Sequence, residues 1–184
     1  MLDHLQLVAR QHQDLGVGAG EIPAAQMAER VDGADLGAPG LKLGGEGLRM
    51  AIDNVRAQVS DAIAGGANLV ILSDRYADAE NAPIPALLVT AAVHHHLVRE
   101  KTRTQVGLVV ETGEAREIHH HAMLIGYGAD AINPYLAFET LWELRALKKF
   151  DVKDDKTVVK NYIKAVDKGL LKVMSKMGIS TLQS

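Results

Sequence analysis

LVILSDR (69–75), VGLVVETGEAR (106–116) and DAINPY (130–135) are three apolar runs that each stop at polar, turn-prone residues. Helix-like segments lie between them at 82–100 and 117–129. A short β-branched run closed by polar residues and followed by an amphipathic helix is typical of a βα unit. Stacked βα units bring the polar groups at the carboxyl ends of their strands to one face, where ligands and tunnels usually lie. We therefore predict an α/β fold built as a partial, incomplete barrel-like array of βα units.

The periodicity of the apolar residues predicts the individual elements. A helix that begins near Glu46 should stop at Gly65-Gly66, because glycine favours a helix carboxyl end. The predicted strands are Asn68–Leu72, Gln105–Glu111, Ala131–Asn133 and a fourth at Ile179–Thr181. The other predicted helices begin near Pro83 and Pro85, near Glu114–Glu117 and at Leu136, and the last one spans Asp155–Met177.

Three of these helices have a predicted apolar face. In the helix that begins near Glu46, it is Leu48, Ile52, Val55, Val59, Ala62 and Ile63. In the helix after Pro85, the inward stripe is Leu87, Leu88, Ala91, Ala92, His95 and Val98. In the last helix, it is Val159, Tyr162, Ile163, Val166, Leu170, Val173, Met174 and Met177. Lysines recur every four residues along this last helix, and each step overshoots one turn by about 40°, so they drift around it. This drift favours a solvated face over a basic strip that binds a partner.

Residues 1–47 differ in composition from the rest of the chain. They hold nine of the seventeen glycines, and loops separate two segments that could form short helices, at 2–15 and 22–31. Glycine at this density costs about 0.5–1 kcal/mol per residue within an element. We predict a loosely packed, helical and glycine-rich segment at 1–47, followed by a βα domain at 48–184.

The composition narrows the classes of function. The chain has 184 residues, a net charge of −3 and 4% aromatic residues, which disfavours binding to nucleic acid or to an anionic membrane surface. It has no cysteine, so these residues supply no disulfide, thiolate nucleophile or cysteine ligand for an iron–sulfur cluster. The longest apolar run is too short for a bilayer, which needs roughly 20 residues, and the amino terminus does not resemble a signal peptide. We expect a cytoplasmic protein.

Six of the eight histidines lie in two triplets, His94–His96 and His119–His121. Consecutive helical residues point about 100° apart, so one triplet cannot place three imidazoles on one ion. One histidine from each triplet could still meet across two helices, but hydrogen bonds to neighbouring loops are favoured. We expect neither a metal site nor a bound cofactor in this chain.

The candidate site is the polar face at the strand ends. Its residues are Ser73, Asp74, Arg75, Glu111, Thr112, Arg116, His120, Asn133 and Tyr135. Glu111 or Asp74 could act as an acid or base, and Arg75 or Arg116 could hold an anion. The alternative, which we favour, is that the arginines pair with Asp74, Glu111 or Glu114 and fix the strand-end loops.

Four segments resemble the central domain of the large subunit of glutamate synthase. They are GGANLVILSDR (65–75), APIPALLVTAAVHHHLVRE (82–100), the run 103–141 from RTQVGLVVETGEAR to INPYLAFETL, and KGLLKVMSKMGISTLQS (168–184). They occur in the family's order, whereas residues 1–47 carry no such segment. The resemblance implies a central-type βα domain at 48–184, truncated at its carboxyl end.

The resemblance also implies a function. The family makes two glutamates from glutamine and 2-oxoglutarate, with ammonia passing through a tunnel from an amidotransferase domain to an FMN-bearing barrel beside an iron–sulfur cluster. The central domain joins these two partner domains and helps to wall the tunnel, which implies a tunnel-lining role for the candidate residues. FMN and the cluster are expected in the full-length parent, and exposed apolar surface is expected to allow self-association of this fragment.

Two other functions stay open at this point. One is a small stand-alone α/β enzyme that uses Glu111, Arg116 and a histidine at the strand-end face. The other is a binding module that presents the lysine-bearing helix at 155–177. The absence of cysteine and of a complete catalytic set favours a structural and channelling domain that is inactive alone.

Overall fold

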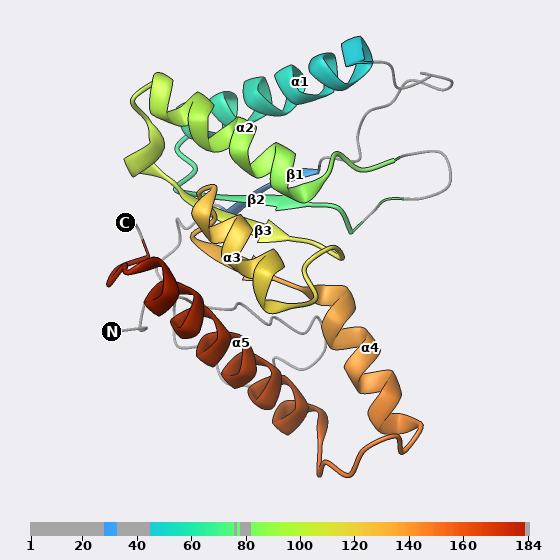
Figure 1. Ribbon diagram of the computed structural model, residues 1–184. Coiled ribbons are helices and arrows are strands. Elements are labelled where there is room, and N and C mark those ends of the chain that lie inside the picture. Colours follow the sequence, from blue (N-terminus) through green and yellow to red (C-terminus); the bar gives the residue numbers. More distant parts are fainter. Residues whose placement is uncertain (1–27, 33–44, 76, 78–81, 183–184) are drawn as a thin grey trace, which may run out of the picture.

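The computed structural model describes residues 45–75, 77 and 82–182. It also describes the backbone, but not the side chains, of residues 28–32. The helix expected at 2–15 lies outside these residues. The described residues form an α/β fold around one parallel sheet (Figure 1), which confirms the predicted class.

The sheet contains four strands in the same order as in the sequence. They are β1 (Ala28–Asp32), β2 (Leu69–Ser73), β3 (Gly107–Glu111) and β4 (Ala131–Asn133). Three of them fall where the apolar runs predicted strands. Crossovers between neighbouring parallel strands are right-handed, so sequential order places the linking helices on one face of the sheet.

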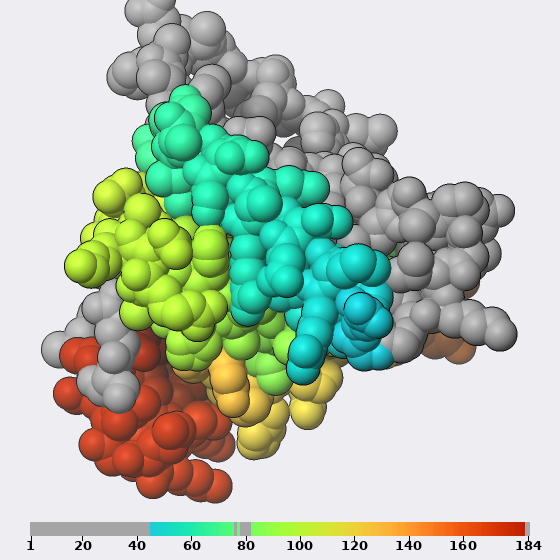
Figure 2. Space-filling model, turned by 90° about the horizontal axis from the view of Figure 1, so that it is seen from above, coloured from blue at the N-terminus to red at the C-terminus, as the bar shows by residue number. Residues whose placement is uncertain are grey.

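The linking helices are α1 (Gly45–Ala64), α2 (Ala86–Arg99) and α3 (Ile118–Gly126), and the turn η1 (Arg103–Gln105) precedes β3. Beyond β4 come α4 (Tyr135–Ala146) and α5 (Asp155–Met177). In Figure 2, α1 lies beside α2, while α5 lies apart from α1 and packs instead on α3 and α4. The last helix has the predicted bounds.

The core lies between the sheet and these helices. One cluster joins α1 and α2 to β2 and β3 through Val55, Val59, Val70, Val93 and Leu108. A second cluster continues it under α3, through residues such as Val110, Leu124 and Ile132. The apolar stripe predicted for α1 is confirmed, because Val55, Val59 and Ala62 are buried and Leu48, Ile52 and Ile63 pack against the core.

The stripe predicted for α2 is wrong in half of its members. The buried residues are Ala86, Val89, Thr90, Ala92, Val93 and Leu97, whereas Leu88, His95 and Val98 are exposed. Apolar residues surround most of this helix, so their spacing fitted two faces equally well. Packing against β2 and β3 selects the face that carries the β-branched residues.

Two predictions of local structure are also corrected. Ala28–Val31, the end of the helix predicted at 22–31, belongs to strand β1, whose residues pair in parallel with Leu69–Ser73. Its backbone hydrogen bonds go to the neighbouring strand, so tertiary pairing overrides local propensity. Ile179–Thr181, predicted as a fourth strand, is irregular, and the amide of Ile179 donates to the carbonyl of Met174 to close α5.

A clamp around Arg103 holds the opposite end of the sheet. The Arg103 guanidinium donates to His94 Nδ1 (3.1 Å), to the carbonyls of Val106 and Gly128 (both 2.9 Å) and to Asp130 Oδ2 (2.8 Å). Asp130 also accepts from the amide of Leu108 at 2.8 Å. The second half of α2, the start of β3 and the turn before β4 are thereby connected.

Candidate functional site at the carboxyl ends of the strands

The register of the sheet places three candidate residues in one row. Ser73 lies opposite Glu111 in the pairing of β2 with β3, and Glu111 lies opposite Asn133 in the pairing of β3 with β4. Each is the last residue of its strand. The prediction that the polar groups of different strands converge on one face is therefore realised for these three.

Glu111 is the centre of this row. Its Oε2 accepts from Ser73 Oγ at 2.5 Å, and its Oε1 accepts from Arg75 Nε at 3.1 Å and from Asn133 Nδ2 at 3.4 Å. The Glu111 side chain is only 12% exposed. A carboxylate so enclosed requires the charge of Arg75 and these donors to compensate for lost water.

Arg75 connects this row to α4. Its Nη1 donates to Glu139 Oε1 at 2.9 Å, and its guanidinium carbon lies 4.0 Å from the centre of the Tyr135 ring. Desolvation opposes the charge of Arg75, but hydrogen bonds and attraction from Glu139 and Glu111 outweigh it and raise the pKa. Sequence reasoning missed Glu139, although it follows Tyr135 by four residues and so shares its helix face.

Asp74 is the centre of a second, adjoining group. Its carboxylate accepts from Thr112 Oγ1 at 2.6 Å and from the amide of Gly113 at 3.0 Å. Burial, together with a hydrogen bond to Asp74, raises the pKa of the Tyr135 phenol to about 12. Asp74 thus fixes the turn after β3 against the start of α4.

Arg116 and His120 lie beyond these two groups, on the turn that leads into α3. Arg116 Nε donates to the carbonyl of Gly113 at 3.4 Å, and His120 Nδ1 accepts from the amide of Arg116 at 3.2 Å. Glu117 and His120 form a capping box at the start of α3. The expected pairing of arginine with a strand-end carboxylate is therefore observed for Arg75, whereas Arg116 is bound to a backbone carbonyl.

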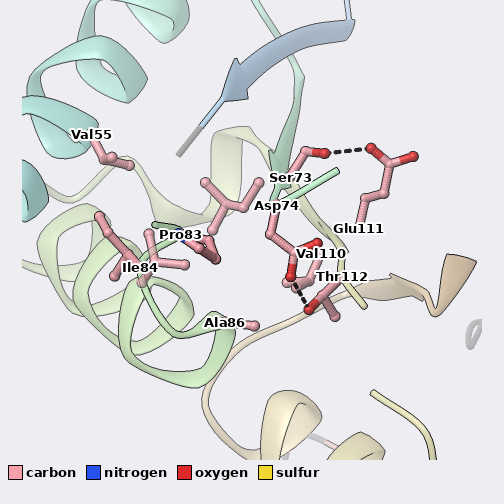
Figure 3. A pocket seen from close by; sticks show the side chains of 11 residues that line it. Val55, Ser73, Asp74, Pro83, Ile84, Ala86, Val110, Glu111 and Thr112 are labelled. Atoms are coloured by element: carbon pink, nitrogen blue, oxygen red, sulfur yellow. Dashed lines mark hydrogen bonds between the residues drawn. The ribbon is translucent and has the colours of Figure 1, made fainter. Parts of the chain in front are cut away.

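A small cavity adjoins these polar groups (Figure 3). Ser73, Asp74, Glu111 and Thr112 line one side, and apolar side chains such as Val55, Ile84 and Val89 line the other. Its volume is about 20 Å³, which is room for about one water molecule. A flavin does not fit this cavity.

The histidines of the two triplets contact different parts of the molecule. His94 binds Arg103, His96 shares a hydrogen bond of 2.8 Å with Ser60, and His121 is buried against α5. Within the described part of the chain, no three histidine, aspartate or glutamate side chains lie close enough to hold a metal ion together. The chain contains no cysteine for an iron–sulfur cluster.

Comparison with known proteins identifies the family. The family model of the glutamate synthase central domain matches residues 13–184. The chain belongs to the glutamate synthase central domain family. The match includes most of the segment at 1–47, and the domain boundary at residue 48 stays a prediction.

Three relatives illustrate the range of this family. The chain is 48% identical to the glutamate synthase [NADPH] large chain of Bacillus subtilis (strain 168) over 139 residues, which are 76% of this chain and 9% of the relative. It is 45% identical to the glutamate synthase [NADH] of Saccharomyces cerevisiae over 145 residues, 75% of this chain and 7% of the relative. It is 41% identical to the ferredoxin-dependent glutamate synthase of Pyropia yezoensis over 155 residues, 78% of this chain and 10% of the relative.

The chain therefore spans a tenth or less of the length of these curated relatives. None of its described helices combines the length and the apolar character that crossing a membrane requires.

Proposed function

We propose that this chain is the structural domain that joins the amidotransferase and FMN-barrel domains of a glutamate synthase, and that its strand-end face helps to wall the passage for ammonia. The parent enzyme would convert glutamine and 2-oxoglutarate into two glutamates in the cytoplasm. The barrel-like array begun by β1–β4 would continue in that parent. Membership of the central domain family is the observation that carries this proposal.

The geometry of the strand ends supports a wall in preference to a stand-alone active site. Glu111 and Asp74 each accept several hydrogen bonds from neighbours, and Arg75 is held by two carboxylates and an aromatic ring. These side chains are engaged in fixing loops, and Arg116 projects from a separate turn. The adjoining cavity accommodates a molecule the size of water, and ammonia is of that size.

FMN and an iron–sulfur cluster would belong to other parts of the parent. The 184 residues contain no cysteine to ligate a cluster, and the strand-end cavity is too small for a flavin. The role of this chain toward both groups is then indirect, through the position of the domains that bind them.

The proposal can be tested in a chimera of the Bacillus subtilis large chain whose matching segment is replaced by this sequence. Ser73→Leu would fill the strand-end cavity, whereas Ser73→Ala removes the hydroxyl and keeps the room. We expect Ser73→Leu to lower glutamine-dependent glutamate synthesis several-fold, because ammonia no longer passes. Synthesis from ammonia added to the solution should change little.

Ser73→Ala is the matched control, since it breaks the same hydrogen bond to Glu111 without adding bulk. Release of free ammonia into the solution should rise for Ser73→Leu alone. Equal coupling of glutamine hydrolysis to glutamate synthesis in both variants would contradict a channelling role for this face.

We also propose that the outer surface of α2 and α3 contacts other domains of the parent. Four large apolar side chains remain exposed here: Leu88 and Val98 on α2, Met123 on α3, and Tyr127 directly after α3. The two helices pack against each other. Apolar patches of this kind usually mark interaction sites.

The isolated chain is therefore expected to self-associate through this surface. Sedimentation should show a mass that grows with protein concentration, and Met123→Lys with Tyr127→Lys should return it to the monomer value. Lys164→Met, a change on exposed α5, serves as the control and should not reduce association. A wild-type chain that stays monomeric at high concentration would refute this expectation.

A further inference from the structure

His121 is a fully buried titratable group in the seam where α3 packs on α5. Its exposed fraction is 0%. The two helices approach closely here, because Gly169 of α5 leaves room for the Ile118 side chain of α3, and a Cβ at Gly169 would lie 2.8 Å from Ile118 Cγ2. There is little space in this seam for water to hydrate a charge.

The hydrogen bonding of the imidazole defines its neutral form. His121 Nδ1 lies 2.8 Å from the carbonyl oxygen of Glu117. A carbonyl only accepts, so Nδ1 carries the hydrogen and Nε2 is left with its lone pair. Nε2 is buried and has no hydrogen-bond partner within the described residues.

Protonation would therefore add an N–H at Nε2 that points into a seam with no acceptor for it among the described residues. Burial lowers the pKa of His121; the hydrogen bond to the Glu117 carbonyl opposes this effect, and repulsion from His120 adds to it. The cost of the buried charge falls when the seam opens and water reaches the ring.

The groups that face His121 offer no compensating negative charge within the described part of the chain. From α5 comes the Tyr162 ring, 6.1 Å away, whose pKa is raised by burial to about 12, so the phenol stays neutral. From the turn before α3 comes Arg116, whose carbonyl accepts from Tyr162 at 3.0 Å. On α3 the neighbour is His120, and Glu117 at the N-cap acts on His121 through its backbone carbonyl, while its carboxylate lies beside His120.

We propose that His121 is an acid-sensitive latch: its protonation releases α5 from α3 and from the turn that carries Arg116 at the strand-end site. Tyr162 links the two events, because its ring contacts His121 and Phe138 while its hydroxyl holds Arg116. The latch concerns the packing of this chain and does not depend on a channelling role for the strand ends.

The direction of the pH dependence follows from linkage. In the open state His121 titrates near the ordinary pKa of about 6.5, and in the closed state its pKa is lower. Neutral His121 stabilises the closed seam at pH values above the open-state pKa. This stabilisation is lost as the pH falls toward the closed-state pKa. The opening equilibrium should rise as the pH falls through this window, by at most about tenfold per pH unit.

Asp167 on α5 supplies an effect of opposite sign. Desolvation raises its pKa, so protonation of Asp167 in acid would stabilise the folded state. Loss of α5 packing in acid therefore does not come from this carboxyl.

Hydrogen exchange of the α5 amides in the full chain tests the latch. After correction for intrinsic exchange rates, protection of α5 in the wild type should fall by up to about tenfold between about pH 7.5 and about pH 5.5. The amides of α1 should keep theirs. The single tryptophan, Trp142, stacks on Phe138, which contacts Tyr162, so its fluorescence should report the same transition.

His121→Asn provides a variant with an amide N–H for the Glu117 carbonyl but no group that titrates. Its α5 protection should not change with pH in this range, whatever its absolute stability. His119→Asn, an exposed change on the same helix, should keep the wild-type pH dependence. If His121→Asn does not fold, an NMR titration of the wild-type imidazole decides the matter.

The outcomes are distinct. A His121 resonance that titrates below the ordinary histidine pKa, together with loss of α5 protection, supports the latch. An unchanged pH dependence in His121→Asn, or a His121 resonance that titrates at or above about pH 6.5, overturns it.

Discussion

Gly128→Ala is expected to lower the free energy of unfolding by about 3 kcal/mol, because the added methyl group meets both a strained backbone and a neighbouring side chain. Gly128 has φ +110°, a conformation that L side chains rarely adopt, and a Cβ there would overlap the His94 ring, at 2.5 Å from Cγ. The strained backbone and the overlap each cost about 1–3 kcal/mol. Chemical denaturation of both proteins measures the difference.

Gly126→Ala is the matched control, only two residues away. Gly126 has no positive φ, it ends α3, and no atom lies within 4 Å of the place that an alanine methyl group would take. Its replacement should be neutral or stabilising by up to about 1 kcal/mol. Adding His94→Ala to Gly128→Ala should recover part of the loss, and equal stability for Gly128→Ala and Gly126→Ala would show that the turn has room.

Asp74→Ala is expected to cost about 2–3 kcal/mol of unfolding free energy, because one change removes the acceptor for three groups. Thr112 Oγ1, the Gly113 amide and the Tyr135 phenol all donate to this carboxylate. Hydrogen bonds to a charged group are worth about 1.5–3 kcal/mol each, and partial exposure of Asp74 reduces their sum. Thermal unfolding followed by circular dichroism measures the effect.

Asp53→Ala is the corresponding control on the surface of α1. Asp53 forms an exposed ion pair with Arg56, and the loss of such a pair changes stability by about 0–1 kcal/mol. Asp74→Asn should fall between the two, since the amide keeps one acceptor oxygen. Equal losses of unfolding free energy for Asp74→Ala and Asp53→Ala would show that the hydrogen bonds to Asp74 do not stabilise the fold.

The parallel strands and their polar ends could be predicted because both signals are local. Each apolar run is short and β-branched, and each ends at a turn, so the positions of β2, β3 and β4 followed from the local sequence pattern alone. The meeting of Ser73, Glu111 and Asn133 then follows from parallel pairing. The convergence of strand ends did not require knowledge of any side-chain contact.

What the sequence could not supply was the choice among alternatives that only tertiary packing decides. The α2 helix is apolar on two faces, so its periodicity did not determine which one meets the sheet. Ala28–Asp32 has no strong local preference, and its strand exists through pairing with β2. Glu139 entered the site through its contact with Arg75, a partner 64 residues earlier in the chain.

The row formed by Ser73, Glu111 and Asn133 makes the site insensitive to the length of the segments that connect the strands. Each residue occupies the last place of its strand, so crossovers could gain or lose residues while the three side chains remain neighbours. A slip of one residue within a strand would instead turn its side chain to the opposite face of the sheet. Variation among natural or engineered versions of this domain should therefore accumulate in its helices and loops, while the spacing within each strand stays fixed.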